Sequence, residues 1–217
     1  MKITKYPQSC ILIETKGKKI LIDPGNLDFE ESFIEEWKNP DTILITHKHA
    51  DHCNVEAINK IITENTKVYT TKEVLDFYSD LSAEVVKEGD VIDSNEIKIE
   101  VVKAVHGYVP LFKQGKGINE NVGYIIDDGD KRAYHTSDSI CFENDYKCDV
   151  LFIPVVGHIV MGPWEAAMFA KETGASLVIP VHYDHPRHPM DKELVEKEFS
   201  AQDLNYKFLE NKESVEI

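Results

Sequence analysis

The order in which strand-like and helix-like segments follow one another most constrains the fold of this chain. Short apolar and β-branched runs come first as hairpins and then alternate with helical patterns, and this series occurs twice. Such an order predicts two β-rich layers with helices on their outer faces, an α+β architecture. The predicted strands are 11–14, 18–22, 42–45, 67–70, 96–102, 122–126, 131–135, 150–156 and 177–181, with short strands near 206–209 and 215–217. The predicted helices are 55–64, 72–78, 163–173 and 192–200.

One long segment does not fit either pattern. Residues 107–121 contain three glycines and a proline and have no apolar periodicity, so they are expected to form a loop. Long loops inside compact domains are often functional. We find no internal repeat, low-complexity tract or linker composition, and residues 1–217 are therefore expected to form a single domain.

Composition limits the possible partners and the compartment. The 217 residues carry 24 basic and 39 acidic side chains, a net charge of −15, which repels nucleic-acid phosphates. No apolar run approaches the roughly 20 residues that a membrane-spanning helix needs. The N-terminal residues lack the apolar core of a signal peptide, and Cys10, Cys53, Cys141 and Cys148 form no C-x-x-C pair. A cytoplasmic protein with free thiols is expected, bound to neither nucleic acid nor membrane.

The densest chemical signal is the segment T-H-K-H-A-D-H at 46–52, directly after the strand predicted at 42–45. In an extended chain His47 and His49 point to the same side, because side chains alternate with period two. Asp51 and His52 lie at the turn into the next predicted helix. Four ligand-type residues within six positions predict a metal site, whereas a polar loop with chance histidines is the ordinary alternative.

Three further candidate ligands each follow a predicted strand. They are His106, Asp138 and His182. Taken singly each could be an ordinary loop residue. However, strand ends gather at one edge of a layered fold, where binding sites usually form. Together with the cluster at 46–52, the three residues predict a site with more ligands than one tetrahedral zinc ion needs.

These residues carry a resemblance to the metallo-β-lactamase-fold superfamily. The motif H-x-H-x-D-H, then a lone His, an Asp after a strand and a final His follow the superfamily order, and residues 21–25 are similar to its opening strands. Residues 161–167 and 178–183 resemble a branch of small metal-dependent hydrolases that includes L-ascorbate-6-phosphate lactonase and N-acyl-phosphatidylethanolamine phospholipase D. The resemblance covers nearly the whole chain and implies a four-layer αββα sandwich.

The resemblance also implies roles for the ligands. His47, His49 and His106 would bind a first metal ion, and Asp51, His52 and His182 a second, with Asp138 bridging both. The cofactors would be two divalent ions, zinc in the first instance, with manganese or iron as alternatives. Asp51 is in addition a candidate catalytic residue. A hydroxide bridging the ions would attack the substrate.

The expected activity is hydrolysis of a small anionic phosphoester, cyclic phosphodiester or lactone. In the superfamily that this chain resembles, β-lactamases of the commonest zinc class carry Cys at the position of Asp138, di-iron flavoproteins usually carry Glu at that of His49, and ribonucleases usually add a further domain. None of these features is present in the sequence. The alternative from another class is a sensor or scaffold that keeps the metal site without turnover.

Several other residues have two open interpretations. His158, in a glycine-containing turn after the strand at 150–156, is a candidate catalytic residue that donates a proton or hydrogen-bonds substrate, or it only caps the turn. Asp23 could hydrogen-bond a ligand histidine or form an Asp-Pro turn. His185, Arg187 and His188 could touch substrate or lie in a solvated loop. Cys53 is expected to be a packed thiol, His135 structural and Lys48 solvated.

Overall fold

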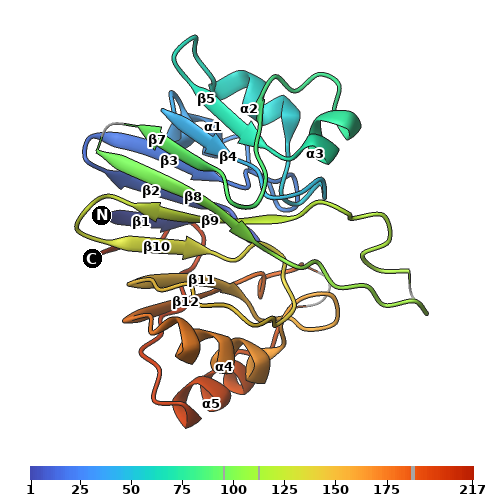
Figure 1. Ribbon diagram of the computed structural model, residues 1–217, viewed down its shortest axis with the longest axis vertical. Coiled ribbons are helices and arrows are strands. Elements are labelled where there is room, and N and C mark those ends of the chain that lie inside the picture. Colours follow the sequence, from blue (N-terminus) through green and yellow to red (C-terminus); the bar gives the residue numbers. More distant parts are fainter. Residues whose placement is uncertain (95, 112, 187–188) are drawn as a thin grey trace. The chain divides into compact units, whose positions relative to one another are not determined.

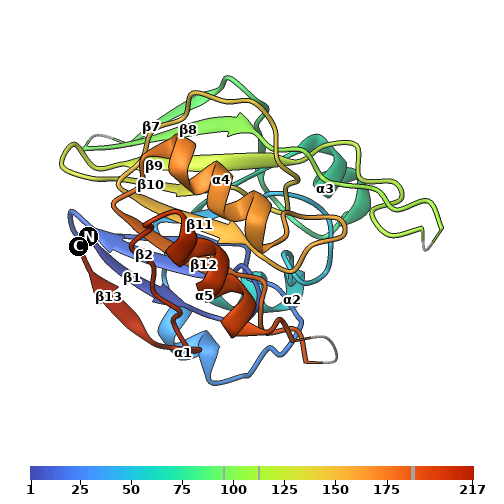
Figure 2. The ribbon, with the colours of Figure 1, turned by 90° about the horizontal axis from the view of Figure 1, so that it is seen from below.

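The computed structural model describes residues 1–94, 96–111, 113–186 and 189–217. Two compact units make up the chain: Met1–Lys87 with Leu209–Ile217, and Glu88–Phe208. Each unit contains one mixed β-sheet and its own helices (Figures 1 and 2, coloured along the sequence). The α+β class expected from the sequence is thus observed. That the two units act as one domain stays a prediction.

The first unit holds a seven-stranded sheet in the order β13-β1-β2-β3-β4-β5-β6. Its strands are β1 (Lys2–Lys5), β2 (Ile11–Thr15), β3 (Lys18–Ile22), β4 (Thr42–Leu44), β5 (Lys67–Thr70), β6 (Glu84–Val85) and β13 (Ser214–Glu216). Strands β1 to β3 pair antiparallel, and β3 to β6 pair parallel through α1 (Phe33–Trp37), α2 (Val55–Ile61) and α3 (Lys72–Phe77). The carboxyl ends of β3, β4 and β5 therefore lie at the same edge of this sheet.

Local sequence explains the hairpin that starts this sheet. Lys16 and Gly17 have φ angles of 48° and 70°, and Thr15 pairs with Lys18 across them. A two-residue loop with both φ angles positive is the type I′ turn, whose twist matches that of the flanking strands. The helices α1 and α2 then bury Phe33, Trp37 and Ile58 in one apolar cluster of this unit.

The second unit holds a six-stranded sheet in the order β12-β11-β10-β9-β8-β7. Its strands are β7 (Val91–Ser94), β8 (Ile97–Lys103), β9 (Val122–Asp127), β10 (Arg132–His135), β11 (Val150–Pro154) and β12 (Leu177–Val181), and its helices are α4 (Pro163–Thr173) and α5 (Lys192–Ala201). Strands β7 to β10 pair antiparallel, and β10 to β12 pair parallel.

Helix α4 matches its predicted bounds because both ends carry strong signals. Pro163 occupies the first helical position, and Gly174 ends the helix with a φ of 70°. Its buried face includes Ala167, Phe169 and Ala170, which belong to the apolar cluster of the second unit together with Val195 and Phe199 of α5. In the described part of the chain, no helix has both the length and the apolar character to cross a membrane.

The helix predicted at 55–64 ends earlier than expected, at Ile61. The Thr66 hydroxyl accepts a hydrogen bond from the backbone N–H of Thr63, and the Thr63 hydroxyl accepts one from the N–H of Asn65. Threonine side chains thus take backbone bonds that would otherwise continue the helix.

The sequence pattern also missed some elements and misplaced one. The missed elements are β1, β6, β7 and α1, which are short or rich in charged residues. The strand predicted near 206–209 was wrong, because this segment forms only a single bridge between Tyr206 and Val178 at the edge of β12.

Candidate metal centre

The first unit positions its candidate ligands through Asp23, which directly follows β3. Its backbone N–H donates to the carbonyl of Leu44 on β4, 2.9 Å away. Its buried carboxylate accepts hydrogen bonds from the Thr46 backbone N–H and hydroxyl, each at 2.8 Å. It also accepts one from His52 Nδ1 at 2.7 Å, because a carboxylate can only accept. The contact between Asp23 and a candidate ligand histidine is thus present.

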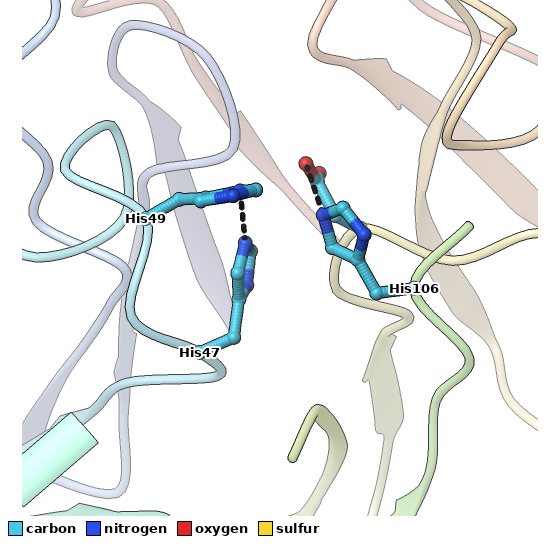
Figure 3. A group of neighbouring side chains, drawn as sticks. His47, His49 and His106 are labelled. Atoms are coloured by element: carbon cyan, nitrogen blue, oxygen red, sulfur yellow. Dashed lines mark hydrogen bonds and ion pairs between the residues drawn. The ribbon is translucent and has the colours of Figure 1, made fainter. Parts of the chain in front are cut away.

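His47 and His49 lie close together, although the chain bends at residues 47 and 48 and is not extended as the period-two argument assumed. Figure 3 shows the contact between His47 Nε2 and His49 Nδ1, which is 3.0 Å long. Two ligands of one tetrahedral ion with bonds of 2.0–2.1 Å lie about 3.3 Å apart. The two nitrogens therefore have nearly the separation of ligands on a single ion. The Thr46 hydroxyl lies 3.1 Å from His47 Nδ1, so Nε2 is the candidate ligand atom of this ring.

Asp51 and His52 form the second pair of this unit. His52 Nε2 lies 3.8 Å from the carboxylate of Asp51, and the rings of His47 and His52 have centroids 4.1 Å apart. Because Asp23 holds His52 Nδ1, the ring directs Nε2 to the side of Asp51. Asn54, rather than Asp51, caps helix α2, with its side chain accepting from the N–H of Ala57.

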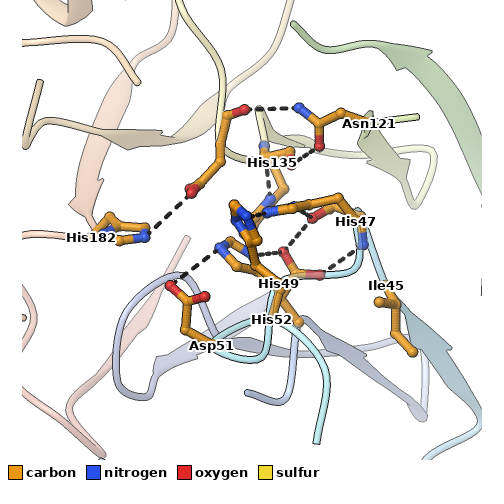
Figure 4. Close-up of polar contacts among 12 residues, drawn as sticks. Ile45, His47, His49, Asp51, His52, Asn121, His135 and His182 are labelled. Atoms are coloured by element: carbon orange, nitrogen blue, oxygen red, sulfur yellow. Dashed lines mark hydrogen bonds and ion pairs between the residues drawn. The ribbon is translucent and has the colours of Figure 1, made fainter. Parts of the chain in front are cut away.

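The second unit brings its three candidate ligands together at the ends of different strands. His106 follows β8, Asp138 follows β10 and His182 follows β12. Nε2 of His106 lies 4.0 Å from Asp138 Oδ2, and Nε2 of His182 lies 3.4 Å from the same oxygen, the latter contact being drawn in Figure 4. His106 Nδ1 contacts the carbonyl of Gly107 at 2.9 Å, which turns Nε2 toward Asp138. One buried carboxylate thus faces two imidazoles.

Backbone hydrogen bonds tie the ligand loops of this unit to one another. The N–H of Ile140 donates to Val105, that of Met161 to Ser139, and that of Gly107 to Ile159, all at 2.8–2.9 Å. Gly107 has to be glycine at this crossing, since a Cβ there would lie 2.6 Å from the Ile159 carbonyl oxygen. The loop that carries His158 is therefore joined directly to the loop that carries His106.

The remaining candidates differ in their surroundings. His158 is exposed in the turn after β11, with a φ of 66°, and its role in catalysis stays a prediction. His185 is half-buried, whereas Arg187 and His188 lie outside the described residues. Lys48 is not simply solvated, because it forms a 2.9 Å ion pair with Glu73. Cys53 is buried as expected, and burial raises the pKa of its thiol to about 12.

Two polar residues that contact the turn before Asp138 escaped the sequence interpretation. The Ser137 hydroxyl donates to Asn121 Oδ1 at 2.6 Å, and Asn121 Nδ2 donates to the backbone carbonyl of Asp138 at 2.8 Å. Neither serine nor asparagine is a usual metal ligand, and Asn121 and Ser137 are 16 positions apart in the sequence. Only the pairing of β9 with β10, which places Asn121 beside the end of β10, could have indicated the contact.

The donor set fits divalent metal ions. Within the first unit the donors are His47, His49, Asp51 and His52, and within the second His106, Asp138 and His182. All seven offer imidazole nitrogen or carboxylate oxygen, which suit zinc, iron and manganese. Asp23 accepts a hydrogen bond from Nδ1 of His52, and the Gly107 carbonyl contacts Nδ1 of His106. Histidines that bind metal ions usually have such a partner on the ring nitrogen that does not bind the ion.

Comparisons with known proteins agree with this fit. Residues 2–182 match the family description "Beta-lactamase superfamily domain". The chain is 31% identical over 197 residues to a "UPF0173 metal-dependent hydrolase" of Korarchaeum cryptofilum, covering 84% of this chain and 83% of that protein.

Solved structures share the fold. Igni18, a metallo hydrolase from Ignicoccus hospitalis, is similar with a TM-score of 0.80 and 24% identity over 99% of this chain and 97% of that one. The metallo-β-lactamase fold protein YhfI of Bacillus subtilis gives a TM-score of 0.79 at 16% identity over 99% of this chain and 98% of that one. The fold expected from the sequence is thereby confirmed. The narrower resemblance to L-ascorbate-6-phosphate lactonase stays a prediction.

Proposed function

This chain belongs to the β-lactamase superfamily and is a metal-dependent hydrolase, and we propose that it works with two divalent ions bridged by Asp138. One observation carries the proposal: Asp138 Oδ2 lies 4.0 Å from His106 Nε2 and 3.4 Å from His182 Nε2. A buried carboxylate that faces two imidazoles from separate loops could help to hold an ion beside each histidine.

The ligand count supports a pair of ions. In this proposal His47, His49 and His106 hold the first ion, while Asp51, His52 and His182 hold the second. Seven donor residues exceed the four ligands that one tetrahedral zinc ion takes. Neither unit by itself contains enough donors for two ions. Zinc is the first candidate, with manganese and iron as alternatives, because the set contains no thiolate.

When bound, such ions supply a nucleophilic water at neutral pH and polarise the oxygen of the bond to be cleaved. The residues of the chain hold that chemistry in place. Asp23 fixes the ring of His52, Thr46 contacts Nδ1 of His47, and the Gly107 carbonyl fixes His106. Asp51, whose carboxylate lies 3.8 Å from His52 Nε2, would help to hold the second ion.

Charge supports an anionic substrate. Two divalent ions would outweigh the negative charges of Asp51, Asp138 and a hydroxide, so the loaded site would be positive although the chain as a whole carries −15. We therefore propose a small phosphoester, cyclic phosphodiester or lactone as substrate, hydrolysed by a cytoplasmic enzyme.

Metal counting and a substrate panel test this function. Metal-free protein is saturated with zinc or manganese, and bound ions are counted by elemental analysis. Two ions per chain are expected, and the manganese form should show a spin-coupled electron paramagnetic resonance signal, because bridged ions lie about 3.5–4 Å apart. His182→Ala should lose one ion, whereas His185→Ala, which changes a histidine outside the set, should keep both.

The loaded protein is then assayed with a generic phosphodiester, a phosphomonoester and a lactone. Turnover that disappears on chelation and returns with metal supports the hydrolase. Saturation at one ion would contradict the bridged pair. A doubly loaded protein that is inactive toward the whole panel would favour a sensor.

A further inference from the structure

The turn that presents Asp138 has an unfavourable backbone conformation. Ser137, the residue before Asp138, has a φ of 60°. Residues other than glycine seldom adopt this left-handed region, because it is sterically unfavourable for them. Such a conformation persists only where surrounding contacts hold it. The contacts that fix Ser137 therefore decide where the carboxylate of Asp138 lies.

Three side chains of the second unit bond to Ser137. One is Thr136, whose hydroxyl donates to the Ser137 carbonyl at 3.1 Å, and the others are His135 and Asn121. His135 Nδ1 accepts the backbone N–H of Ser137 at 3.2 Å, and Asn121 Oδ1 accepts the Ser137 hydroxyl at 2.6 Å. Asn121 Nδ2 donates to the backbone carbonyl of Asp138 at 2.8 Å. Figure 4 shows Asn121 and His135 with these bonds. His135, Ser137 and Asp138 are buried, and Asn121 is half-buried.

The two ends of the Asn121 amide have different partners. Its oxygen accepts from residue 137 and its nitrogen donates to residue 138, so a single planar group spans the turn. Asn121 immediately precedes β9, which pairs antiparallel with β10. The Asn121 side chain is therefore held at the start of β9, the strand that pairs with β10, and the turn with Asp138 follows β10.

We propose that Asn121, acting with Ser137, is a positioning residue that holds the Asp138 carboxylate between His106 and His182 and so sets the affinity of the metal pair. This inference rests on the proposed function, in which Asp138 binds both ions. Asn121 itself contacts the turn and not the reacting atoms.

The test compares three variants of the full chain. In Asn121→Ala both amide bonds are lost. Ser137→Gly removes the hydroxyl but lets the backbone adopt a positive φ without strain, so the fold should be kept. The matched control is Asn144→Ala, because the Asn144 amide likewise makes two backbone bonds in the second unit, to Phe142 and Tyr146.

Zinc affinity is measured by competition with a chromophoric chelator, the cobalt-loaded proteins are compared by visible absorption, and thermal unfolding of the metal-free proteins checks the fold. Asn121→Ala and Ser137→Gly should bind the weaker zinc ion about 10- to 100-fold less tightly, with an altered cobalt spectrum. Asn144→Ala should keep both the wild-type affinity and the spectrum.

The outcomes separate the inference from the function it rests on. A wild-type chain that binds two ions, with folded Asn121→Ala and Ser137→Gly variants of unchanged affinity and spectrum, would overturn the positioning role alone. A wild-type chain that never binds a second ion would overturn the bridged pair and the positioning role together. If Asn144→Ala lost as much zinc affinity as Asn121→Ala, the loss would be a general effect of broken loop hydrogen bonds. That result would also overturn the positioning role of Asn121.

Discussion

Asp23 shows how much of the candidate centre depends on one side chain that is not itself a proposed ligand. Its carboxylate accepts from Thr46 twice and from His52 once, and it is fully buried. Its backbone has a φ of 49°, uncommon for a residue other than glycine, although aspartate tolerates it better than most. A residue at the end of β3 thereby orients an imidazole 29 positions later in the chain.

Replacing Asp23 by asparagine tests this arrangement. The amide keeps the shape but cannot accept at both ends, so either Thr46 or His52 loses its partner. We expect Asp23→Asn to weaken binding of the second ion about 10- to 100-fold, the usual effect of removing such an orienting group. Chelator competition on purified protein measures it. Unchanged affinity would show that His52 is oriented without Asp23.

His158 is the second residue to test singly. Its turn is joined to the His106 loop by the bond from Gly107 to Ile159. If it donates a proton or hydrogen-bonds the substrate, His158→Ala should keep both metal ions while turnover falls roughly 10- to 1,000-fold. Steady-state kinetics with parallel metal analysis provides the measurement. Unchanged kinetics on the true substrate would leave His158 as a turn residue.

At the scale of elements, the candidate ligands of each unit follow strand ends that the sheet itself brings together. In the first unit β3 and β4 pair in parallel, so the segments that begin at Asp23 and at Ile45 leave the sheet at one edge. Cross-bonds from Asn26 to Ala50 and from Asn54 to Pro24 then hold the two loops together. The ligand loop is thus packed between backbone segments instead of lying free on the surface.

Gly25 makes that packing possible. A Cβ at this position would lie 1.8 Å from the carbonyl oxygen of Asp51, which is backbone and cannot move aside alone. We expect Gly25→Ala to destabilise the fold by about 1–3 kcal/mol and to weaken metal binding, because Asp51 must shift. Thermal unfolding and metal titration measure the two effects.

Gly162→Ala is the control for this substitution. A Cβ at Gly162 would lie 3.6 Å from the flexible carboxylate of Glu165 and 3.8 Å from Gly157 Cα, both ordinary contact distances, and the φ of Gly162 is −82°. A Gly25→Ala variant with wild-type stability and metal affinity would mean that the two loops are not constrained at this crossing.

At the scale of the whole molecule, carboxylates paired with basic groups make the stability of the fold depend on pH. Burial acts to raise the pKa of Glu100, but hydrogen bonds and charge from Arg132 and Lys98 outweigh it and hold this pKa below 4.5. Burial also opposes ionisation of Asp41, but Lys18 and the backbone N–H of Lys19 lower its pKa below 3.8. These carboxylates are therefore more acidic in the folded than in the unfolded chain.

Acidification should accordingly destabilise the metal-free protein. The unfolded chain takes up protons first, so the contribution of these groups is present above their unfolded pKa values, near 4, and is lost as the pH falls through the lower folded values. Thermal unfolding between pH 6 and pH 3 should show a falling midpoint, and Glu100→Gln should reduce the fall. A midpoint that rises on acidification would contradict this expectation.

The sequence by itself predicted the α+β class and most strands, and it supplied seven candidate ligands whose role stays a prediction. Its signals were local: Lys16-Gly17 specifies a turn, Pro163 and Gly174 bound a helix, and H-x-H-x-D-H places four donors within six residues. The short strand β6 and helix α1 lack such signals and were not predicted. Elements of so few residues are too short to show a periodic pattern of apolar side chains.

Only the tertiary structure decided which atoms orient those ligands. The bonds from His52 to Asp23 and from Ser137 to Asn121 join residues 29 and 16 positions apart. An Asp before Pro24 has the same sequence pattern in a simple turn, and an Asn before a strand is common in loops. Parallel pairing of β3 with β4 and antiparallel pairing of β9 with β10 bring these polar groups within hydrogen-bond distance. Burial then makes each bond costly to lose, so the sheets, and not the local sequence, fix the geometry of the candidate centre.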